Sequence, residues 1–252
     1  MSIASEISRL QTAKSDLATS ITNKGVTVPA ATTIDGYAAL VDQIQTGGSY
    51  PIPSNAVEMA SLKGDGNAYI DTGIKGSSSI TFKMEVYFTT SFTNANVAII
   101  GSRISSTSSQ LTVQYYNTSS NKYFRWAFGN NSVTTANHGG TTGDYIVGNL
   151  DREKLFVISG AKELTEEVAS ATFNNNYNMY LFAMNNGGTV GGLGGNAYTR
   201  IYWCKIYDSG VLVRDFVPAR VGQVGYMFDK VSGQLFGNAN STGAFGLGSD
   251  VT

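Results

Sequence analysis

Charged residues are scarce in this chain of 252 residues. They make up 14% of it, and the formal net charge is −1, whereas a typical globular protein is about 25% charged. No run of lysine and arginine occurs anywhere in the sequence. Because a nucleic-acid surface needs clustered cations to neutralise phosphates, this composition excludes nucleic acid as a partner.

Long apolar runs are also missing. None approaches the roughly 20 residues that a membrane-spanning helix requires, so we expect no membrane insertion. The first ten residues, MSIASEISRL, lack a basic region followed by an apolar block. We therefore expect no secretory signal at this end of the sequence.

Cysteine and histidine occur once each. Cys204 cannot form an internal disulfide, and strand alternation would place it on one face with Tyr202 and Ile206, as a small buried hydrophobe. His138 lies in a Gly-rich stretch, where imidazole would be poorly held for a catalytic triad. A single His and a single Cys cannot build a His-rich zinc site. We expect no cofactor.

Glycine is abundant instead, at 29 residues, while hydrophobic residues reach 42% and aromatic residues 11%. A chain this hydrophobic is not expected to be disordered. Few charges combined with much Asn, Ser, Thr and Gly are typical of an all-β protein with many turns.

Residues 3–21 predict an amphipathic helix. Apolar side chains recur there at alternating spacings of four and three, which is the seam of a coiled coil, and Lys14 interrupts it. About three heptads are marginal in isolation, so the helix needs partner chains. The alternative is that it packs on its own chain. The seam residues that we predict to mediate oligomerisation are Ile3, Ile7, Leu10, Leu17 and Ile21.

A second helix is predicted at Ile34–Ile44, where apolar residues again share one face. A Gly-Gly-Ser stretch followed by two prolines then forms a linker. The sequence therefore predicts a helical anchoring module at residues 1–46, a Gly/Pro linker at 47–54 and a β domain at 55–252.

The β domain is predicted from about a dozen short apolar stretches separated by turns, too many for one sheet, so two packed sheets are expected. Two polar-Gly links, Asp208-Ser209-Gly210 and Val231-Ser232-Gly233, favour hairpins near the end of the chain. Only Lys162–Ala169 suggests a brief helix. The predicted strands are Ala68–Ile74, Ile80–Phe88, Val97–Gly101, Gln110–Tyr116, Tyr123–Phe128, Tyr145–Val147, Lys154–Ile158, Tyr177–Met184, Ala197–Tyr207, Val211–Phe216, Gly225–Phe228 and Leu235–Phe236.

Two segments carry a resemblance to known families. The closing stretch Arg200–Asn238, together with Ala68–Gly73, resembles the concanavalin A-like, laminin G-type jelly rolls of bacteriophage virion proteins. The first forty or so residues, with their Gly-Val-Thr-Val-Pro and Asp-Gly-Tyr patterns, resemble a helical module at the amino ends of phage tail and head fibre proteins.

The resemblance implies a mainly β fold, an antiparallel two-sheet jelly-roll sandwich preceded by a short α-helical N-terminal segment. It also implies a phage fibre or decoration protein on the virion surface, at the capsid or tail exterior, released by lysis. Its partners would be other virion proteins, contacted through the N-terminal helices. The resemblance favours a homotrimer, whereas Ile at a and Leu at d by themselves favour two strands.

Catalysis is not expected. Jelly rolls that this chain resembles include glucanases. The resemblance implies that a catalytic member would carry its carboxylates as Glu-x-Asp-x-x-Glu on a single strand, and this sequence contains no such triplet. Hydrolysis with retention needs two carboxylates about 5 Å apart. Glu163, Glu166 and Glu167 cluster, but in a charged stretch that we interpret as a solvated turn. The Gly-rich segment 187–195 precedes a strand, so it is interpreted as a flexible loop and not as a phosphate cradle.

Some laminin G-type relatives bind calcium through rim oxygens, and Asp65, Asp71, Asp144 and Asp151 lie near predicted loop ends. No oxygen-rich calcium loop is visible, so we expect no obligatory metal.

Carbohydrate recognition combines an aromatic ring, which stacks on a sugar, with amides that bond its hydroxyls. Two sets of such residues flank predicted turns, whereas Trp203 is expected in the core. The predicted function is attachment by multivalent binding to host-surface or mucus glycans; the alternatives are a purely structural decoration protein and a glycan hydrolase. The candidate ligand-binding residues are Tyr115, Tyr116, Tyr123, Trp126, Asn130, Asn131, Asn174, Asn175, Asn176 and Asn185.

Overall fold

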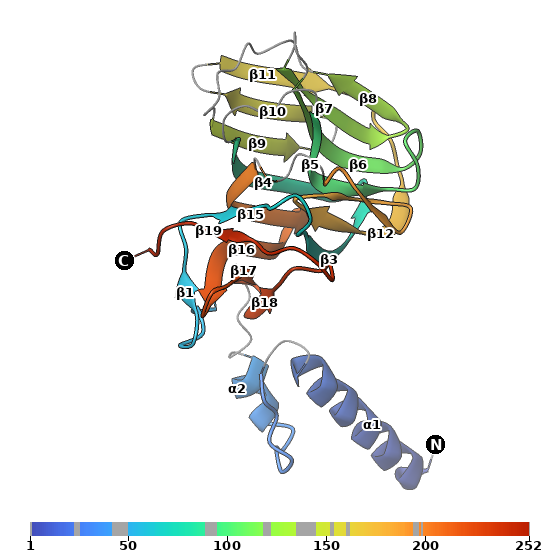
Figure 1. Ribbon diagram of the computed structural model, residues 1–252. Coiled ribbons are helices and arrows are strands. Elements are labelled where there is room, and N and C mark those ends of the chain that lie inside the picture. Colours follow the sequence, from blue (N-terminus) through green and yellow to red (C-terminus); the bar gives the residue numbers. More distant parts are fainter. Residues whose placement is uncertain are drawn as a thin grey trace. The chain divides into compact units, whose positions relative to one another are not determined.

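The computed structural model forms two compact units, Met1–Ser49 and Tyr50–Thr252 (Figure 1). The residues that it describes are 2–22, 26–41, 50–88, 95–117, 122–134, 145–151, 154–159, 162–193, 197 and 199–251.

The first unit contains helices α1 (Ile3–Thr22) and α2 (Gly36–Val41). The helix predicted at 3–21 is present, and the Ser2 hydroxyl caps it by accepting the Ser5 N–H at 3.2 Å. The second helix begins two residues later than predicted, because Ile34 and Asp35 form a turn before it. Its predicted last residues, 42–44, lie outside the described residues.

A small core closes the first unit. Ile21, Val26 and Tyr37 are buried together, and the Tyr37 hydroxyl donates to the Lys14 carbonyl at 3.4 Å. Ile21 was predicted on the oligomerisation seam, but it is used within its own chain. The other four seam residues remain exposed: Ile3 at 82%, Ile7 at 52%, Leu10 at 49% and Leu17 at 43%.

The second unit is a sandwich of two sheets. The larger sheet has the order β11-β10-β9-β4-β15-β16-β17-β18, and three short strands, β1, β2 and β19, attach to it. Its strands are β1 (Val57–Glu58), β2 (Leu62–Lys63), β4 (Ile80–Phe88), β9 (Tyr145–Asp151), β10 (Lys154–Ser159), β11 (Lys162–Glu167), β15 (Thr199–Asp208), β16 (Val211–Val221), β17 (Val224–Asp229), β18 (Gln234–Phe236) and β19 (Gly246–Leu247).

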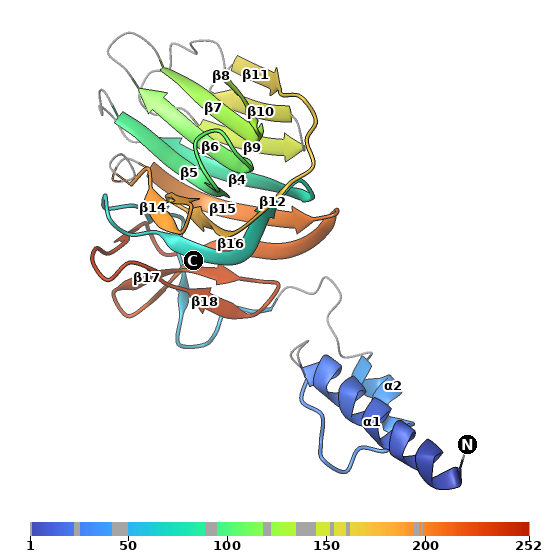
Figure 2. The ribbon, with the colours of Figure 1, turned by 90° about the vertical axis from the view of Figure 1, so that its right-hand side faces the viewer.

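The smaller sheet has the order β14-β13-β5-β6-β7-β8, with β3 and β12 paired beside it. Its central strands β5, β6 and β7 run side by side (Figure 2). Among the described pairs, only β13–β5 is parallel. Its strands are β3 (Ile70–Ser77), β5 (Ala95–Arg103), β6 (Gln110–Asn117), β7 (Lys122–Gly129), β8 (Asn131–Thr134), β12 (Asn174–Leu181), β13 (Met184–Asn186) and β14 (Thr189–Gly191).

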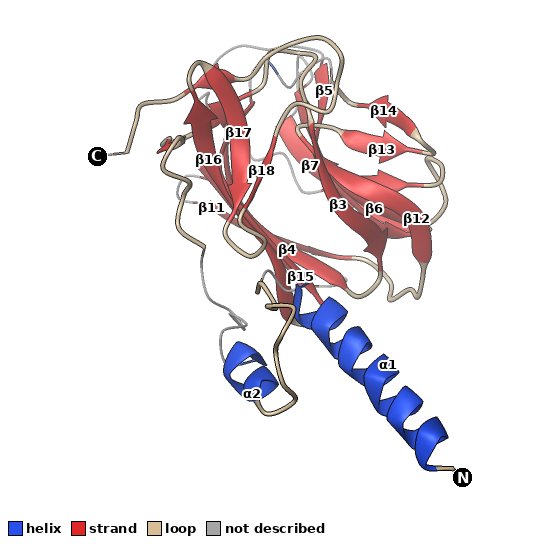
Figure 3. Cartoon of the chain, turned by 90° about the horizontal axis from the view of Figure 1, so that it is seen from below, coloured by secondary structure: helices blue, strands red, loops and turns tan. Residues whose placement is uncertain are grey.

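The core lies between the two layers, which Figure 3 shows from below. On β4, every second residue from Ile80 to Phe88 is buried, and on β7 the rings of Phe124, Trp126 and Phe128 face them from the other sheet. The predicted mainly β, two-sheet jelly-roll sandwich with an N-terminal helix is confirmed.

Strand β11 corrects one prediction. Lys162–Ala169 was expected to form a brief helix, but Lys162–Glu167 pairs antiparallel with β10 at six consecutive positions. A continuous ladder with a neighbouring strand outweighs the helix propensity of Lys and Glu. The Gly-rich segment 187–195 is likewise not only a loop, because it contains β14.

A β-bulge in β15 corrects another prediction. Ile201 pairs with Val86 and Trp203 with Glu85, so Tyr202 is an extra residue in the ladder. Cys204 is buried on the core face with Ile206, as predicted, but Tyr202 is not with them. Burial in apolar surroundings raises the pKa of the Cys204 thiol far above its usual range, and the nearby Asp215 charge adds to this.

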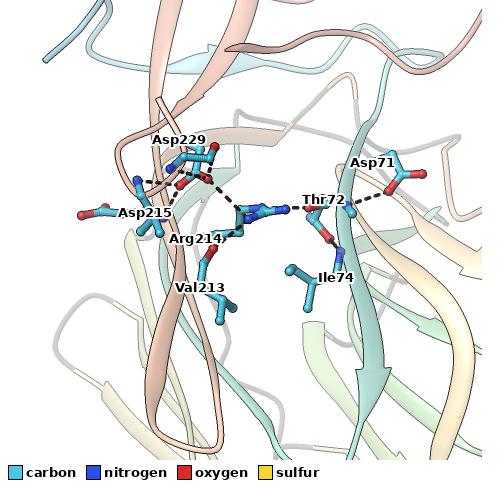
Figure 4. Close-up of polar contacts among 10 residues, drawn as sticks. Asp71, Thr72, Ile74, Val213, Arg214, Asp215 and Asp229 are labelled. Atoms are coloured by element: carbon cyan, nitrogen blue, oxygen red, sulfur yellow. Dashed lines mark hydrogen bonds and ion pairs between the residues drawn. The ribbon is translucent and has the colours of Figure 1, made fainter. Parts of the chain in front are cut away.

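A buried ionic cluster joins the two sheets where β16 and β17 face β3 (Figure 4). The Arg214 Nε–H donates to the Thr72 carbonyl at 3.0 Å, and its Nη1 lies 3.6 Å from the Asp229 carboxylate. Asp229 is fully buried and also accepts N–H groups from Asp215, Val231 and Ser232. This cluster fixes the hairpin β16–β17 against the smaller sheet.

Candidate functional site

The outer face of the smaller sheet is polar along its central strand, β6. Leu111, Val113 and Tyr115 enter the core. Alternation places Gln110, Thr112 and Gln114 on the opposite face, yet these three are only 1%, 0% and 1% exposed. We call the outer face of β5, β6 and β7 the polar face.

Two arginines flank β6 on the polar face. Arg125 lies on β7 directly opposite Gln114, and its guanidinium donates to Gln114 Oε1 at 3.0 Å and to Ser132 Oγ at 3.1 Å. Arg103 lies on β5 and donates to Asn186 Oδ1 at 2.8 Å. Both side chains are half-buried.

The charge of Arg125 acts on the neighbouring guanidinium of Arg103. Partial burial lowers the pKa of Arg103, the positive charge of Arg125 lowers it further, and Tyr116 acts in the opposite direction. Strands β14, β13, β5, β6, β7 and β8 contain no aspartate or glutamate in their sequences. The polar face therefore carries two positive charges and receives no carboxylate from these six strands.

A tyrosine pair lies next to the arginines. Tyr116 and Tyr123 are direct cross-strand partners, and their rings stack with centroids 5.0 Å apart and planes at 9°. The Tyr116 hydroxyl also donates to Gln114 Oε1, at 3.4 Å. The polar face thus combines an aromatic surface with two cations.

Two buried acceptors on the polar face lack a partner among the described residues. They are Gln110 Oε1 and Thr112 Oγ1. A buried polar atom left without a hydrogen bond costs about 1–3 kcal/mol. Both atoms are covered, so they do not belong to the surface that a bound molecule can reach.

The aromatic candidates from the sequence divide between the two faces of the smaller sheet. Tyr116 and Tyr123 are half-exposed on the polar face. Tyr115 and Trp126 point to the other side: Trp126 is fully buried, and Tyr115 stacks on Phe88 with centroids 4.3 Å apart. Covered rings offer no surface to a sugar, so we remove Tyr115 and Trp126 from the candidate site.

The asparagine candidates on β12 take part in hydrogen bonds within the protein. Asn175 is buried and donates to Ser102 Oγ and to the Ser109 carbonyl. Asn174 and Asn176 are exposed, and Asn174 Oδ1 accepts the Asn176 N–H in an irregular part of β12, where Asn176 has a φ of 60°. Asparagine tolerates this left-handed conformation better than most residues.

Asn130, Asn131 and Asn185 lie nearer the polar face. Asn130 is exposed and accepts the Ser109 N–H at 3.1 Å, whereas Asn131 is exposed at the start of β8. Asn185 is buried and accepts the Gly188 N–H at 2.9 Å. All three positions border the strands of the polar face, and the side chains of Asn130 and Asn185 are both engaged in hydrogen bonds to the backbone.

Sequence reasoning missed Arg103, Gln110, Gln114 and Arg125. A signal was present, because the segment Gln-Leu-Thr-Val-Gln alternates polar and apolar residues from position 110. That alternation places Gln110 and Gln114 on one face. The position of Arg103 and Arg125 on either side of them depends on strand pairing, which the sequence does not reveal.

The aspartates considered as metal ligands, Asp65 and Asp71, accept hydrogen bonds from neighbouring N–H groups of the protein. Asp65 accepts backbone N–H groups of Asn67, Ala68 and Ala244 at 2.8, 2.7 and 2.6 Å. Burial acts to raise its pKa, but these hydrogen bonds together hold the pKa below its ordinary value. Asp71 accepts from Gly73 and Asn178. Within the described residues, no three His, Cys, Asp or Glu side chains gather as metal ligands.

The remaining acidic candidates are only partly described. Glu163, Glu166 and Glu167 lie on strand β11, not on a turn, with Glu166 half-buried and Glu167 exposed. The side chains of Glu163 and Asp151 lie outside the described residues, as do His138 and Asp144.

No family model matches the sequence, and no curated protein matches it. Solved structures do resemble it. A protein of Bacteroides ovatus ATCC 8483 to which carbohydrate binding is ascribed is 10% identical, with a TM-score of 0.48, over 78% of this chain and 62% of that one. The chain thus spans less than two thirds of that protein.

Two further structures have the same kind of likeness. The CBM40 domain of Ruminococcus gnavus IT-sialidase is 12% identical, with a TM-score of 0.40, over 60% of this chain and 90% of that one. Domains LG4-5 of the mouse laminin α1 chain are 11% identical, with a TM-score of 0.43, over 77% of this chain and 46% of that one. At such identities a likeness concerns the fold alone, so the ligand must be inferred from the residues of this chain.

Across the described part of the chain, neither helix is long and apolar enough to cross a membrane.

Proposed function

We propose that the jelly-roll domain binds glycans through its polar face, and that these glycans carry a carboxylate or a sulfate. The observation that carries the proposal is the pair Arg103 and Arg125, placed beside stacked tyrosines in strands without any acidic residue. An anionic sugar supplies the negative charge that these strands lack.

The chemistry of the polar face fits both parts of such a ligand. A guanidinium group binds a carboxylate or sulfate through paired, charge-assisted hydrogen bonds. The exposed parts of Tyr116 and Tyr123 offer an apolar surface to the C–H groups of a sugar ring.

Replacing Arg125 with alanine tests the proposal. On an array of acidic and neutral glycans, the unmodified protein should bind acidic members, and Arg125→Ala should weaken that binding at least about tenfold, because a hydrogen bond to a charged group contributes about 1.5–3 kcal/mol. The matched control is Arg220→Ala on the larger sheet, where Arg220 pairs with Asp250. Acidic-glycan binding that survives the Arg125 change intact would exclude this site.

We further propose that the protein acts on a virion surface, as a fibre or decoration protein anchored and trimerised by its first unit. Support comes from the resemblance of its sequence to phage fibre modules and from the exposed row Ile3, Ile7, Leu10 and Leu17. Several copies on one particle would raise avidity about 10²–10⁴-fold over a single weak site.

Glutamate at Leu10 and Leu17 together tests the trimer. Both side chains are exposed, so the helix should still form, but charges on the seam should convert the oligomer to a monomer in light scattering. Thr12→Glu with Thr19→Glu is the control, since these exposed threonines have the same spacing on the opposite side of α1 and bond only locally, to Ser8 and Ser15. An unmodified protein that is already monomeric contradicts the trimer proposal.

A purely structural decoration protein remains the alternative function, in which the polar face contacts other virion chains. It is favoured if assembled full-length protein binds no member of the array. A glycan hydrolase is the third function, and release of reducing sugar from a bound glycan would establish it.

A further inference from the structure

A hollow lies on the outer face of the larger sheet, on the opposite side of the sandwich from the polar face. Its volume is about 670 Å³, within the range of roughly 300–1,000 Å³ typical of small-ligand sites. Side chains of β4, β15 and β16 line it, and we call it the Trp203 hollow. Its principal lining residues are Glu85, Tyr202, Trp203, Lys205, Tyr207 and Asp215.

The bulge in β15 creates the aromatic part of this hollow. In a regular strand, Tyr202 and Trp203 would point to opposite faces. Because the ladder passes from Ile201–Val86 to Trp203–Glu85, both side chains line the hollow, while Ile201 and Cys204 stay in the core. Trp203, which the sequence placed in the core, is therefore half-exposed on the surface.

Hydrogen bonding and ion pairing hold the hollow in shape. Trp203 Nε1–H donates to the Glu85 carboxylate at 2.6 Å, which fixes the plane of the indole. Lys205 Nζ lies 3.3 Å from the Asp215 carboxylate on the neighbouring strand. The indole face is thus held beside two carboxylates and an ammonium group, a site already organised before a ligand arrives.

The charges of the hollow are balanced. Its lining contains Lys83, Lys205 and Lys230 against Glu58, Glu85 and Asp215. This balance selects neither anions nor cations, in contrast to the polar face. An apolar partner is also disfavoured, because it would cover these charged groups without replacing their bonds to water. A neutral molecule that is rich in hydroxyls and has an apolar face can stack on the aromatic rings and form hydrogen bonds with the carboxylates and ammonium groups of the hollow.

We propose that the Trp203 hollow binds a neutral saccharide. The sugar ring stacks on the Trp203 indole and contacts Tyr202, while the carboxylates of Glu85 and Asp215 accept hydrogen bonds from its hydroxyls and Lys205 donates one. This site shares no residue with the polar face and does not depend on it. One domain then presents two saccharide sites of different charge preference on opposite faces.

The two tryptophans of the chain provide a direct readout, because Trp126 is fully buried and Trp203 is half-exposed. Full-length protein is titrated with neutral oligosaccharides of glucose, galactose, mannose and N-acetylglucosamine while acrylamide quenching is measured. At least one sugar should protect the quenchable tryptophan. Isothermal titration calorimetry, which needs no tryptophan, then compares the variants. Trp203→Ala should weaken the binding about tenfold, near the upper end of what an aromatic ring contact contributes, whereas Arg125→Ala should leave it unchanged.

Trp203→Phe is the control for a folding defect in Trp203→Ala, because it keeps an aromatic ring at this position and removes only the hydrogen bond to Glu85. It should fold with the same melting temperature and lose less affinity than Trp203→Ala. The proposal is overturned if no neutral sugar protects the fluorescence at millimolar concentration, or if a sugar that binds is held equally by Trp203→Ala. Loss of acidic-glycan binding in Arg125→Ala alone would concern the polar face and not this hollow.

Discussion

Asp229→Ala should destabilise the second unit by about 3–5 kcal/mol, the usual cost of removing one partner from a buried charge pair. Asp229 is fully buried, and its carboxylate accepts the Ser232 hydroxyl at 2.6 Å and three backbone N–H groups besides facing Arg214. Alanine would leave all of these donors unpaired. Chemical denaturation of the full chain, followed by tryptophan fluorescence, measures the loss.

Asp250→Ala is the matched control for this change. Asp250 also pairs with an arginine, Arg220, at 2.7 Å, but it is exposed on the surface. Water replaces the lost partner there, so the denaturation midpoint should hardly move. Equal midpoints for the two variants would show that the Arg214–Asp229 cluster does not fix the hairpin β16–β17.

Trp126→Ala should cost about 3–5 kcal/mol of stability, as large-to-small changes of buried aromatic residues do. The Trp126 ring is fully buried and lies 5.9 Å from the Phe128 ring, centroid to centroid. The denaturation midpoint is the measurement, and glycan binding at subdenaturing temperature should persist because the ring faces away from the polar face.

Trp126→Phe separates packing from hydrogen bonding at the same position. Trp126 Nε1 has no hydrogen-bond partner among the described residues. Phenylalanine removes this unpaired N–H and leaves a smaller cavity, so the loss should be well below that of alanine. If Trp126→Ala abolishes binding without changing stability, Trp126 belongs to a ligand site after all.

Local patterns in the sequence predicted much of the fold. Strand β4 occupies the predicted residues 80–88, because strict alternation of apolar and polar residues determines both its extent and its buried face. The predicted turn at Asp208–Gly210 joins β15 to β16, with Ser209 and Gly210 at φ values of 50° and 82°. Such positive values match the two-residue hairpin turns that suit twisted strands.

Trp203 was misplaced because a bulge interrupts alternation. From Thr199 to Ile201 the pattern has period two, and one extra residue then reverses the face of all that follows. Nothing in the local composition marks Tyr202 as that residue. Only the pairing with β4, more than a hundred positions earlier in the chain, determines it.

The polar face was only half predicted for a related reason. Tyr116 and Tyr123 were identified because they flank a turn, and residues near a turn are close in sequence. Burial of Gln114 depends on a distant segment, since its Nε2 donates to the sulfur of Met184 on β13. Contacts at such separations follow from topology, which composition does not encode.

Strand β11 has a consequence for how molecules of this protein meet one another. It pairs with β10 and, in the described ladders, with no other strand, so it is the last strand of the larger sheet on that side. An open strand edge invites a second molecule to continue the sheet. The sequence of β11, Lys-Glu-Leu-Thr-Glu-Glu, places three acidic residues and one basic residue on that edge. Two such edges repel each other, which favours a dispersed protein at high concentration over stacking into fibrils.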